Sequence, residues 1–511
     1  MSAKISSGTQ RQHSDSLFQF IKSLSKAEKR YFKLSASIEI GEKSYMLLFD
    51  SMERQPIYNN EKLCKALNKS NKQLANEKNY LYNLLLKTLA NNHKSIDTLI
   101  LNSLARIELL HSKNLPAECF KVLQKAKQIA IKYELYRYLF QLLQWELRLP
   151  FSGQYNEKEI QKTIDEQQKT LKIIFNINSL DAVSRKVTAI YYDIGHIHTV
   201  QEKKQLHKIM SHPLLQDISK ALSFEAKTYY LHTHSFSSFI ERKPHKIYKH
   251  LEKGIDLYFN NPHQIEYNPG AYCLMLNNLI TSCKLLKRYD KMYYYLMRAN
   301  EHRHYFKSEK EKMRGFLLFR NWLYYYNDKG LFQAAVLKIK EIQKELPEYE
   351  NKFNPIYKID LWMTFAISYF GMEDYDKCLY CLNKIRNEPN LEVRRDMEIS
   401  VKLFYLIIQY EKQNHELLPY LIRSTYRYLL RKKRLFRFEN IILDFLRKDV
   451  LKINSKKELI RSFKKLKNKL ELLPKGSDDK QGFEDFDYMS WLESKIENKP
   501  FAEVVRGKAL K

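Results

Sequence analysis

Apolar and aromatic residues recur at steps of three and four along most of the chain, most clearly between Pro355 and Ile385. In the first half of this stretch they include Trp362, Phe365 and Tyr369, and after a short break the pattern resumes from Tyr375. Steps of three and four place side chains on one face of a helix. The stretch therefore predicts two helices that are joined by a short turn and packed as an antiparallel pair.

The same plan occurs twice upstream at a constant period. The aromatic residue that opens the second helix is Tyr289 in the first copy, Phe332 in the next and Tyr375 in the third, so both steps are 43 residues. A weaker fourth copy is predicted from Leu104 to Ala130, with Cys119 among its buried residues. A constant spacing of this kind is typical of repeat proteins, in which each unit packs on its neighbours.

The third copy carries bulky residues on its first helix and a small residue early in its second, in the order Trp362, Phe365, Ala366, Tyr369, Tyr375, Cys378 and Leu382. This order resembles the tetratricopeptide repeat. The period exceeds the roughly 34 residues of that family and matches the roughly 40 to 47 of HEAT and armadillo units, so the class of helical solenoid stays open. The resemblance implies an all-α fold, a right-handed superhelix of antiparallel helical hairpins with a helical cap at each end.

Composition agrees with an all-α chain and excludes two kinds of phosphate site. The 511 residues include only 12 Gly and 13 Pro, well below the usual shares of about 7% and 5%. No two glycines are closer than Gly476 and Gly482. A dinucleotide fingerprint or a P-loop needs glycines closer together than that. With no catalytic motif visible either, we expect a protein that is not an enzyme and that holds no cofactor.

In chain order we predict five regions. These are a disordered N-terminus (1–13), an N-terminal helical cap (14–96), a repeat solenoid (97–422), basic C-terminal helices (423–473) and a linker with an amphipathic tail helix (474–511). A capping box of Ser25 and Glu28 starts a helix in the cap. Further on, separate helices are expected over 156–175 and 181–194.

The cap also contains a pair of helices, 60–67 and 71–90, of the size of a helix-turn-helix. Its second helix presents polar side chains outward, namely Lys72, Gln73, Asn76, Asn79 and Asn83. Such side chains contact phosphates or base edges in DNA-binding proteins. The alternative is a plain structural cap that covers the apolar face of the first repeat.

The formal net charge is +30, and it is concentrated near the C-terminus. Residues 423–469 contain 17 Lys or Arg and only 4 Asp or Glu, with Tyr426, Tyr428, Phe436 and Phe438 interleaved. Candidate nucleic-acid contacts in this block are Arg431, Lys432, Lys433, Arg434, Arg437, Arg461, Lys464 and Lys465. Such a block suits nucleic acid or, less well, a membrane surface. The alternative is a solvated pair of helices with core aromatics, partly neutralised by acids of the tail such as Glu493.

The repeat resemblance implies a non-catalytic scaffold that binds an acidic or amphipathic segment of another protein on its concave surface. Candidate groove residues are those of the first helices that the packing does not use, namely Asn277, Asn278, Lys284, Arg320, Asn321, Tyr325, Lys358 and Thr364. The alternative function is a nucleic-acid-binding regulator that uses the basic block or the N-terminal helical pair.

Cysteine and histidine spacing predicts no metal site. Six cysteines in a chain of this length do not form a disulfide framework and suit a reducing cytoplasm. Cys378 and Cys381 lack a second ligand pair, so core packing is expected for both. Three His-x-His pairs begin at His196, His232 and His302, but positions two apart diverge on a helix. No secretory signal and no apolar run of about 18 residues is visible, so no membrane span is expected.

Overall fold

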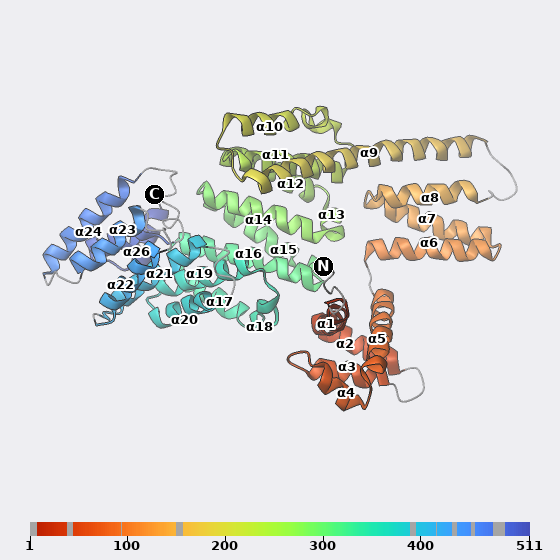
Figure 1. Ribbon diagram of the computed structural model, residues 1–511. Helices are drawn as coiled ribbons and strands as arrows, with labels where there is room; N and C mark the ends of the chain where they lie inside the picture. The colour runs from red at the N-terminus through yellow and green to blue at the C-terminus, as the bar shows by residue number, and fades with distance from the viewer. Residues whose placement is uncertain are drawn as a thin grey trace, which may run out of the picture. The chain divides into compact units, whose positions relative to one another are not determined.

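The computed structural model shows an all-helical protein (Figure 1). It describes residues 8–37, 44–92, 95–149, 157–388, 395–414, 416–431, 437–450, 455–473 and 486–510. Within these ranges there is no strand, which confirms the predicted all-α class. The chain divides into two compact units, Met1–Phe175 and Asn176–Lys511. The boundary falls inside α9 (Glu157–Ile194), and each unit is described by itself.

Unit 1 begins with five helices around their own apolar core. They are α1 (Gly8–Ser23), α2 (Lys26–Ser37), α3 (Ser44–Arg54), α4 (Asn60–Leu67) and α5 (Asn71–Asn92). Leu17, Phe32 and Phe49 are fully buried in this core. The predicted capping box is confirmed, because the Ser25 amide donates to Glu28 Oε2 at 2.8 Å and the Glu28 amide donates to Ser25 Oγ at 3.2 Å.

The rest of unit 1 consists of α6 (Ile96–Ser112), α7 (Pro116–Lys132), α8 (Tyr136–Arg148) and the first part of α9. Cys119 is fully buried on α7, as predicted for the weak fourth copy. The ammonium of Lys127 joins three helices, because it lies 2.8 Å from Glu146 on α8 and 2.8 Å from Glu166 on α9.

The prediction of two helices over 156–175 and 181–194 is wrong, because α9 is one helix of 38 residues. The expected break around Asn176 contains neither Gly nor Pro. The Asn176 side chain instead bonds a later segment: its Nδ2 donates to the Lys220 carbonyl at 2.9 Å, and its Oδ1 accepts from the Leu222 amide at 3.0 Å. The residue at the expected break is thus bonded to a segment that is distant in sequence.

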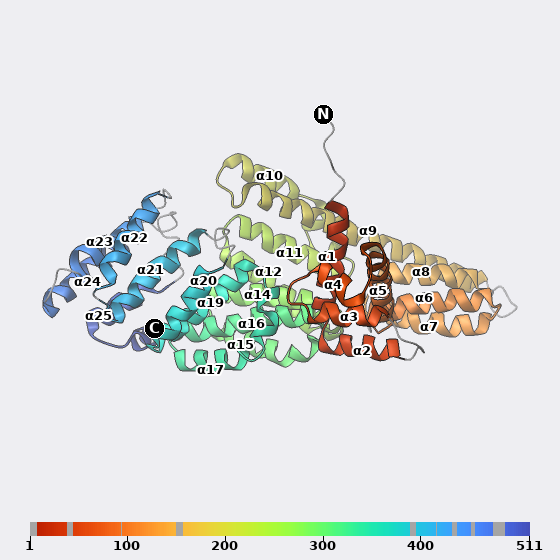
Figure 2. The ribbon, with the colours of Figure 1, turned by 60° about the horizontal axis from the view of Figure 1, so that its bottom comes forward.

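Unit 2 continues as a series of helices after α9. They are α10 (Val200–Met210), α11 (Phe224–Ile240), α12 (Pro244–Phe259), α13 (Pro262–Tyr267), α14 (Pro269–Leu285), α15 (Tyr289–Glu301), α16 (Glu309–Asp328), α17 (Phe332–Ile342), α18 (Leu346–Tyr349), α19 (Pro355–Gly371), α20 (Tyr375–Arg386), α21 (Arg395–Glu411), α22 (Leu418–Arg431), α23 (Arg437–Phe445), α24 (Lys456–Glu471), α25 (Tyr488–Glu497) and α26 (Phe501–Ala509). Short 3₁₀ turns are η1 (Pro213–Leu215), η2 (Ile218–Lys220), η3 (His302–Tyr305) and η4 (Glu350–Lys352), and η6 (Leu446–Val450) is π-helical. Helices α12, α14, α16 and α19 lie side by side in that order (Figures 1 and 2).

The predicted starts of the second helices are confirmed, because Tyr289, Phe332 and Tyr375 are the first residues of α15, α17 and α20. Each of these aromatic side chains lies against the C-terminal end of the first helix of the next pair. The Tyr289 hydroxyl donates to Asp328 at the end of α16, at 3.5 Å. The Phe332 ring lies so close to Gly371, at the end of α19, that a Cβ there would be 2.1 Å from it. The Tyr375 side chain bonds Glu411 at the end of α21. The three aromatic residues thus hold consecutive helical pairs together.

The turns inside these pairs share one backbone geometry. Lys287, Gly330 and Glu373 each adopt the left-handed region, with φ of 55°, 66° and 58°. In each turn the next amide donates to the carbonyl five residues before it, at 2.8, 2.8 and 3.0 Å. This is the hydrogen bond of a Schellman motif. The same bond follows Asn114 between α6 and α7 and Arg242 between α11 and α12.

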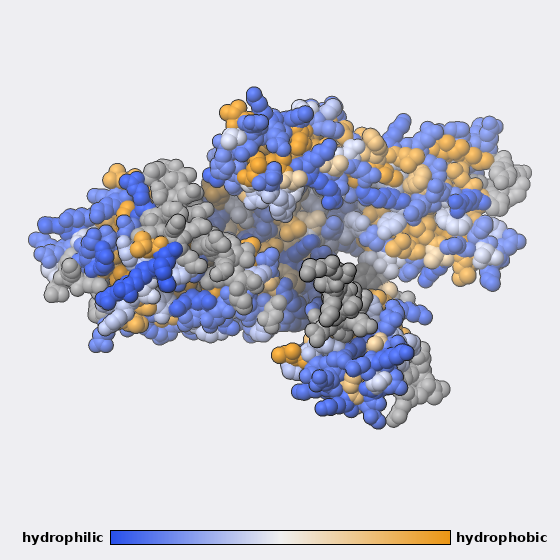
Figure 3. All heavy atoms as spheres, viewed as in Figure 1, coloured by the Kyte–Doolittle hydropathy of each residue, from blue (hydrophilic) through white to orange (hydrophobic). Residues whose placement is uncertain are grey.

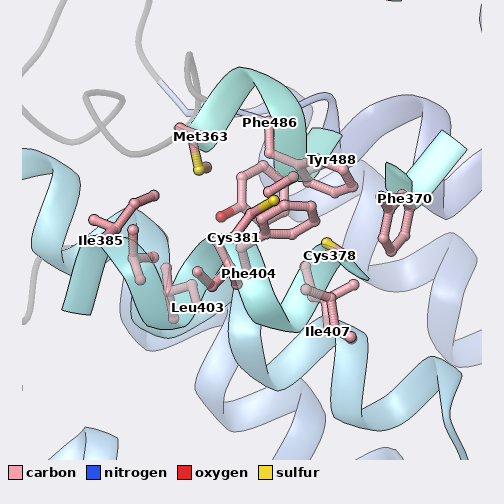
Figure 4. Packing of buried hydrophobic residues seen from close by; sticks show 14 of the residues in the cluster. Met363, Phe370, Cys378, Cys381, Ile385, Leu403, Phe404, Ile407, Phe486 and Tyr488 are labelled. Atoms are coloured by element: carbon pink, nitrogen blue, oxygen red, sulfur yellow. The ribbon is translucent and has the colours of Figure 1, made fainter. Parts of the chain in front are cut away.

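A large apolar core lies between α19, α20, α21 and the C-terminal helices (Figure 4). The thiols of Cys378 and Cys381 on α20 are buried in it, near Phe404 and Phe486. Burial raises the pKa of both thiols. The core role predicted for this cysteine pair is therefore confirmed.

The tail differs from the prediction of one amphipathic helix. It forms α25 and α26, separated at Asn498, which has a φ of 53°, and at Pro500. Helix α26 returns to the turn between α16 and α17, where Lys329 Nζ donates to the Ala509 carbonyl at 3.0 Å. The left-handed Gly330 has no room for a side chain here, because a Cβ would lie 2.7 Å from the Arg506 nitrogen. The tail is thus part of the core of unit 2.

Candidate functional site

The predicted groove residues lie mostly between helices and not on a free surface. Asn321 on α16 is fully buried, and its Nδ2 donates to Asn277 Oδ1 on α14 at 3.0 Å. The prediction of Asn321 as a groove residue is therefore wrong. The units repeat at about 43 residues, so equivalent positions on the first helices of adjacent units face each other. A polar residue at such a position bonds a residue of the adjacent helix instead of a ligand.

A second polar group joins α16 to α19. Arg320 Nη1 lies 2.6 Å from Asp360 Oδ2, and the Tyr324 hydroxyl donates to both Asp360 oxygens at 2.8 Å. Thr364, also predicted for the groove, is only 2% exposed and donates to the Asp360 carbonyl at 2.7 Å. That prediction is wrong as well, because the hydroxyl is bonded inside the helix.

Neighbouring groups keep the Arg320 guanidinium charged. Burial on its own lowers the pKa of Arg320, but Tyr324 and Asp360 outweigh that effect, and the pKa of the guanidinium is raised. Burial and the Asp360 carboxylate raise the pKa of Tyr324 well above its usual value. The arrangement is a buried ion pair with a neutral phenol as donor, which suits a structural role.

Two further candidates of the groove set are engaged within unit 2. The Lys284 ammonium lies 3.9 Å from the centre of the Tyr324 ring, and Lys358 pairs with Glu388 at 2.7 Å. Asn278 on α14 is exposed, and Tyr325 is half-buried with its ring centroid 5.6 Å from that of Tyr293. Among the eight candidates, these last two remain the best placed to touch a partner.

Asn278 belongs to a row of exposed residues on α14. The row consists of Leu274, Asn278, Thr281 and Leu285, at steps of four, three and four. Leu285 is 67% exposed and Leu274 is 40% exposed. Such steps place all four side chains on one side of the helix. We call this row the α14 face, a mixed apolar and polar surface.

The candidate nucleic-acid contacts of the basic block lie on three different helices. Arg431 ends α22, Arg437 begins α23, and Arg461, Lys464 and Lys465 lie on α24; all five are exposed. The remaining candidates lie outside the described residues, namely Lys432, Lys433 and Arg434. The described candidates therefore do not lie on one continuous helix.

The aromatic residues of this block serve the core. Phe438 is fully buried against Tyr488, and the half-buried Tyr428 donates to Glu398 at 2.5 Å. The prediction that the interleaved aromatics stack on bases is wrong for Phe438, and Phe436 lies outside the described residues. The alternative of core aromatics holds for these side chains, since Tyr426 also packs against the core.

The predicted neutralisation by the acidic tail is confirmed for one residue. Glu493 on α25 pairs with Lys467 of the basic block at 2.7 Å and with Lys508 of α26 at 2.7 Å. Burial raises the pKa of Glu493, but these two ammonium groups outweigh it and the pKa is lowered. One lysine of the block is thus used inside the fold and is not free for a ligand.

Three arginines of the basic block line a pocket on α22, and only Arg431 among them was predicted as a nucleic-acid contact. Tyr420, Arg423, Ser424, Arg427 and Arg431 line an open pocket of about 360 Å³ along α22. Figure 3 shows a strongly hydrophilic row over this helix. The signal in the sequence was the spacing of the three arginines at steps of four, which predicts a single helix face. We call these five residues the α22 row.

In the helix-turn-helix-sized pair of unit 1, the second helix exposes and buries the side chains as predicted. The five outward residues are all exposed, namely Lys72, Gln73, Asn76, Asn79 and Asn83. Leu74, Leu81 and Leu85 are fully buried. Lys78 on α5 was not predicted to lie inside, but it is buried and bonds Tyr58 and Asn60. DNA binding by this pair remains a hypothesis.

The histidines of the central pair point to different neighbours. His232 Nδ1 lies 3.2 Å from Ser184 Oγ on α9, whereas His234 Nε2 lies 2.9 Å from the Leu215 carbonyl. The His234 ring also stacks on His250 of α12, with centroids 5.0 Å apart. Among the described residues, no group of three or more His, Cys, Asp or Glu is placed to hold a metal ion.

We expect this histidine group to make unit 2 less stable in mild acid. Burial, then the charges of His234 and nearby lysines, lower the pKa of His250 from 6.5 to about 4. Between these values the unfolded chain binds a proton that the folded chain does not, so stability falls as the pH drops through this window. Allowing for partial exposure, we expect a loss of about 1–2 kcal/mol.

Thermal unfolding of the wild type and of His250→Gln at pH 7 and pH 4.5 checks this expectation. The wild type should lose more of its melting temperature on acidification than His250→Gln does. Equal losses in both proteins would show that other groups cause the pH dependence.

No protein-family model matches this chain, and no curated protein matches it either. In the part of the chain that the structure describes, no helix is both long and apolar enough to cross a membrane.

Proposed function

We propose that this protein is a non-catalytic, cytoplasmic scaffold whose tetratricopeptide-like superhelix binds an acidic or amphipathic segment of another protein. The observation that carries the proposal is the repeated turn geometry. Lys287, Gly330 and Glu373 take the same left-handed conformation at a spacing of 43 residues. Units that repeat in backbone geometry stack on one another and present extended surfaces, which is the usual basis of binding by helical repeats.

The α14 face is the contact surface that we propose for this partner. It combines Leu274 and Leu285, which offer apolar area, with the amide of Asn278. The two leucines stand eleven residues apart, about three helical turns, so they lie on the same side of α14 and could contact the apolar face of an amphipathic helix. The partner's acidic residues would meet a chain of net charge +30, which favours rapid encounter.

Affinity capture with a matched variant tests this function. Leu274→Glu with Leu285→Glu changes the α14 face, and Leu337→Glu with Met372→Glu changes two exposed residues elsewhere in unit 2 as a control. We expect a protein that the wild type and the control capture and that the α14 variant loses. Equal capture by all three proteins would contradict the proposal.

The second candidate function is nucleic-acid binding by the basic C-terminal helices or the N-terminal pair. The exposed arginines of the α22 row favour it. Nuclease treatment of the lysate separates the two candidates, because a captured protein that is bridged by nucleic acid disappears after digestion and a direct partner stays bound.

A further inference from the structure

The three arginines of the α22 row are exposed. Among the described residues, no ion pair involves Arg423, Arg427 or Arg431, although many other basic residues of the chain are paired. Helix α22 itself contains no Asp or Glu. A row of like charges on one helix face destabilises that helix slightly. The repulsion between these charges thus lowers the stability of the fold, and an anionic ligand would remove it.

The spacing of the row suits a ligand with charges along a chain. Arg423, Arg427 and Arg431 stand four residues apart, and each step advances the helix by roughly 6 Å. This step is close to the distance between neighbouring phosphates of an extended single strand. A guanidinium also binds phosphate through two parallel hydrogen bonds, which an ammonium does not offer. The use of arginine at all three positions therefore favours a phosphate chain.

Tyr420 adds a surface for an unpaired base. It lines the same pocket as the arginines and is 68% exposed. An exposed aromatic ring beside a basic track is the arrangement that binds single-stranded nucleic acid, because every base has a face that stacks. Bases inside a duplex are already covered on both faces, so the ring favours a single strand.

A membrane surface fits the row less well. A helix that lies on a membrane inserts an apolar face between the lipids. On α22 that face is already in use, because Ile422 and Leu429 are buried in the core of unit 2. We infer that the α22 row binds single-stranded nucleic acid, with Arg423, Arg427 and Arg431 on consecutive phosphates and Tyr420 stacked on a base.

Fluorescence anisotropy of a labelled 12-nucleotide oligo(dT) and oligo(U) with the full chain, at several salt concentrations, tests the site. The variant Arg423→Gln, Arg427→Gln, Arg431→Gln is expected to bind at least tenfold more weakly. Its slope of log affinity against log salt should be smaller by about 2, since each phosphate contact in a single strand contributes about 0.7.

A matched variant removes the same charge elsewhere. Lys246, Lys249 and Lys253 form an exposed basic row on α12, and changing all three to glutamine should leave the slope unchanged. Replacing the three arginines by lysine should weaken binding but keep the slope, because the charges remain and the paired hydrogen bonds are lost. Tyr420→Ala should weaken binding by roughly tenfold without a change of slope.

Three outcomes would overturn the inference. The first is an equal loss of affinity and slope in the α22 and α12 variants, which would mean that only net charge matters. The second is that a duplex of equal length binds as well as the single strand. The third is that poly-glutamate or vesicles with anionic lipid compete as strongly as the oligonucleotide, which would assign the row to an acidic peptide or a membrane.

Discussion

Trp491→Ala is expected to destabilise unit 2 by about 3–5 kcal/mol, the usual cost of removing a large buried aromatic side chain. Trp491 lies on α25 and is 1% exposed, with its ring 5.7 Å from that of Phe463. Its Nε1 donates to Glu411 at 2.7 Å, and the side chain of Glu411 is itself 8% exposed. The substitution thus opens a cavity and also removes a hydrogen-bond donor to a buried carboxylate.

Thermal and urea unfolding followed by circular dichroism measure this effect. Tyr192→Ala is a suitable control, because Tyr192 is 83% exposed and its loss should change stability by less than about 0.5 kcal/mol. Limited proteolysis adds a local readout, since a tail released from the core is cut before the rest of unit 2. If Trp491→Ala melts like the wild type, the tail does not belong to the core.

The local elements could be predicted because they depend on neighbours in sequence. The starts of α15, α17 and α20 were visible in Tyr289, Phe332 and Tyr375, and a small buried residue was expected at Cys378. These signals arise from helical periodicity and turn chemistry, which act over a few residues. The spacing of 43 residues was visible because each of the three units carries such a local signal.

The tail and the long helix could not be predicted from local patterns. Lys329 bonds a carbonyl 180 residues later, and Asn176 is satisfied by the backbone near Lys220. Nothing in the sequence around either residue shows these partners. An apparent break or a polar tail therefore looks like a loop or a surface helix until the distant contact is known.

The candidate surfaces were predicted less well than the helices. Asn321 and Thr364 were predicted to lie on the surface, but both side chains are buried. An error of one residue in the register turns the predicted face by about 100°. The α22 row was within reach of the sequence, because three arginines at steps of four without an intervening acid are visible there, but its exposure depends on which face α21 and η6 cover.

Asp360→Leu is expected to cost about 3–5 kcal/mol, because it leaves the Arg320 guanidinium buried without a partner charge. The side chain of Arg320 is 14% exposed, and its ion pair with Asp360 joins α16 to α19. The substitution also removes the acceptor of the Tyr324 hydroxyl. Urea unfolding gives the loss, and Asp376→Asn is the control, because Asp376 is 85% exposed and such surface pairs contribute little.

The double variant Arg320→Met with Asp360→Leu separates the value of the ion pair from the cost of a stranded charge. Replacing both members of a buried pair by apolar residues of similar volume is often neutral or stabilising. We therefore expect the double variant to be clearly more stable than Asp360→Leu alone. If both proteins unfold at the same urea concentration, the stranded guanidinium is not the cause of the loss. The remaining cause would then be the packing of α16 on α19, which both substitutions disturb.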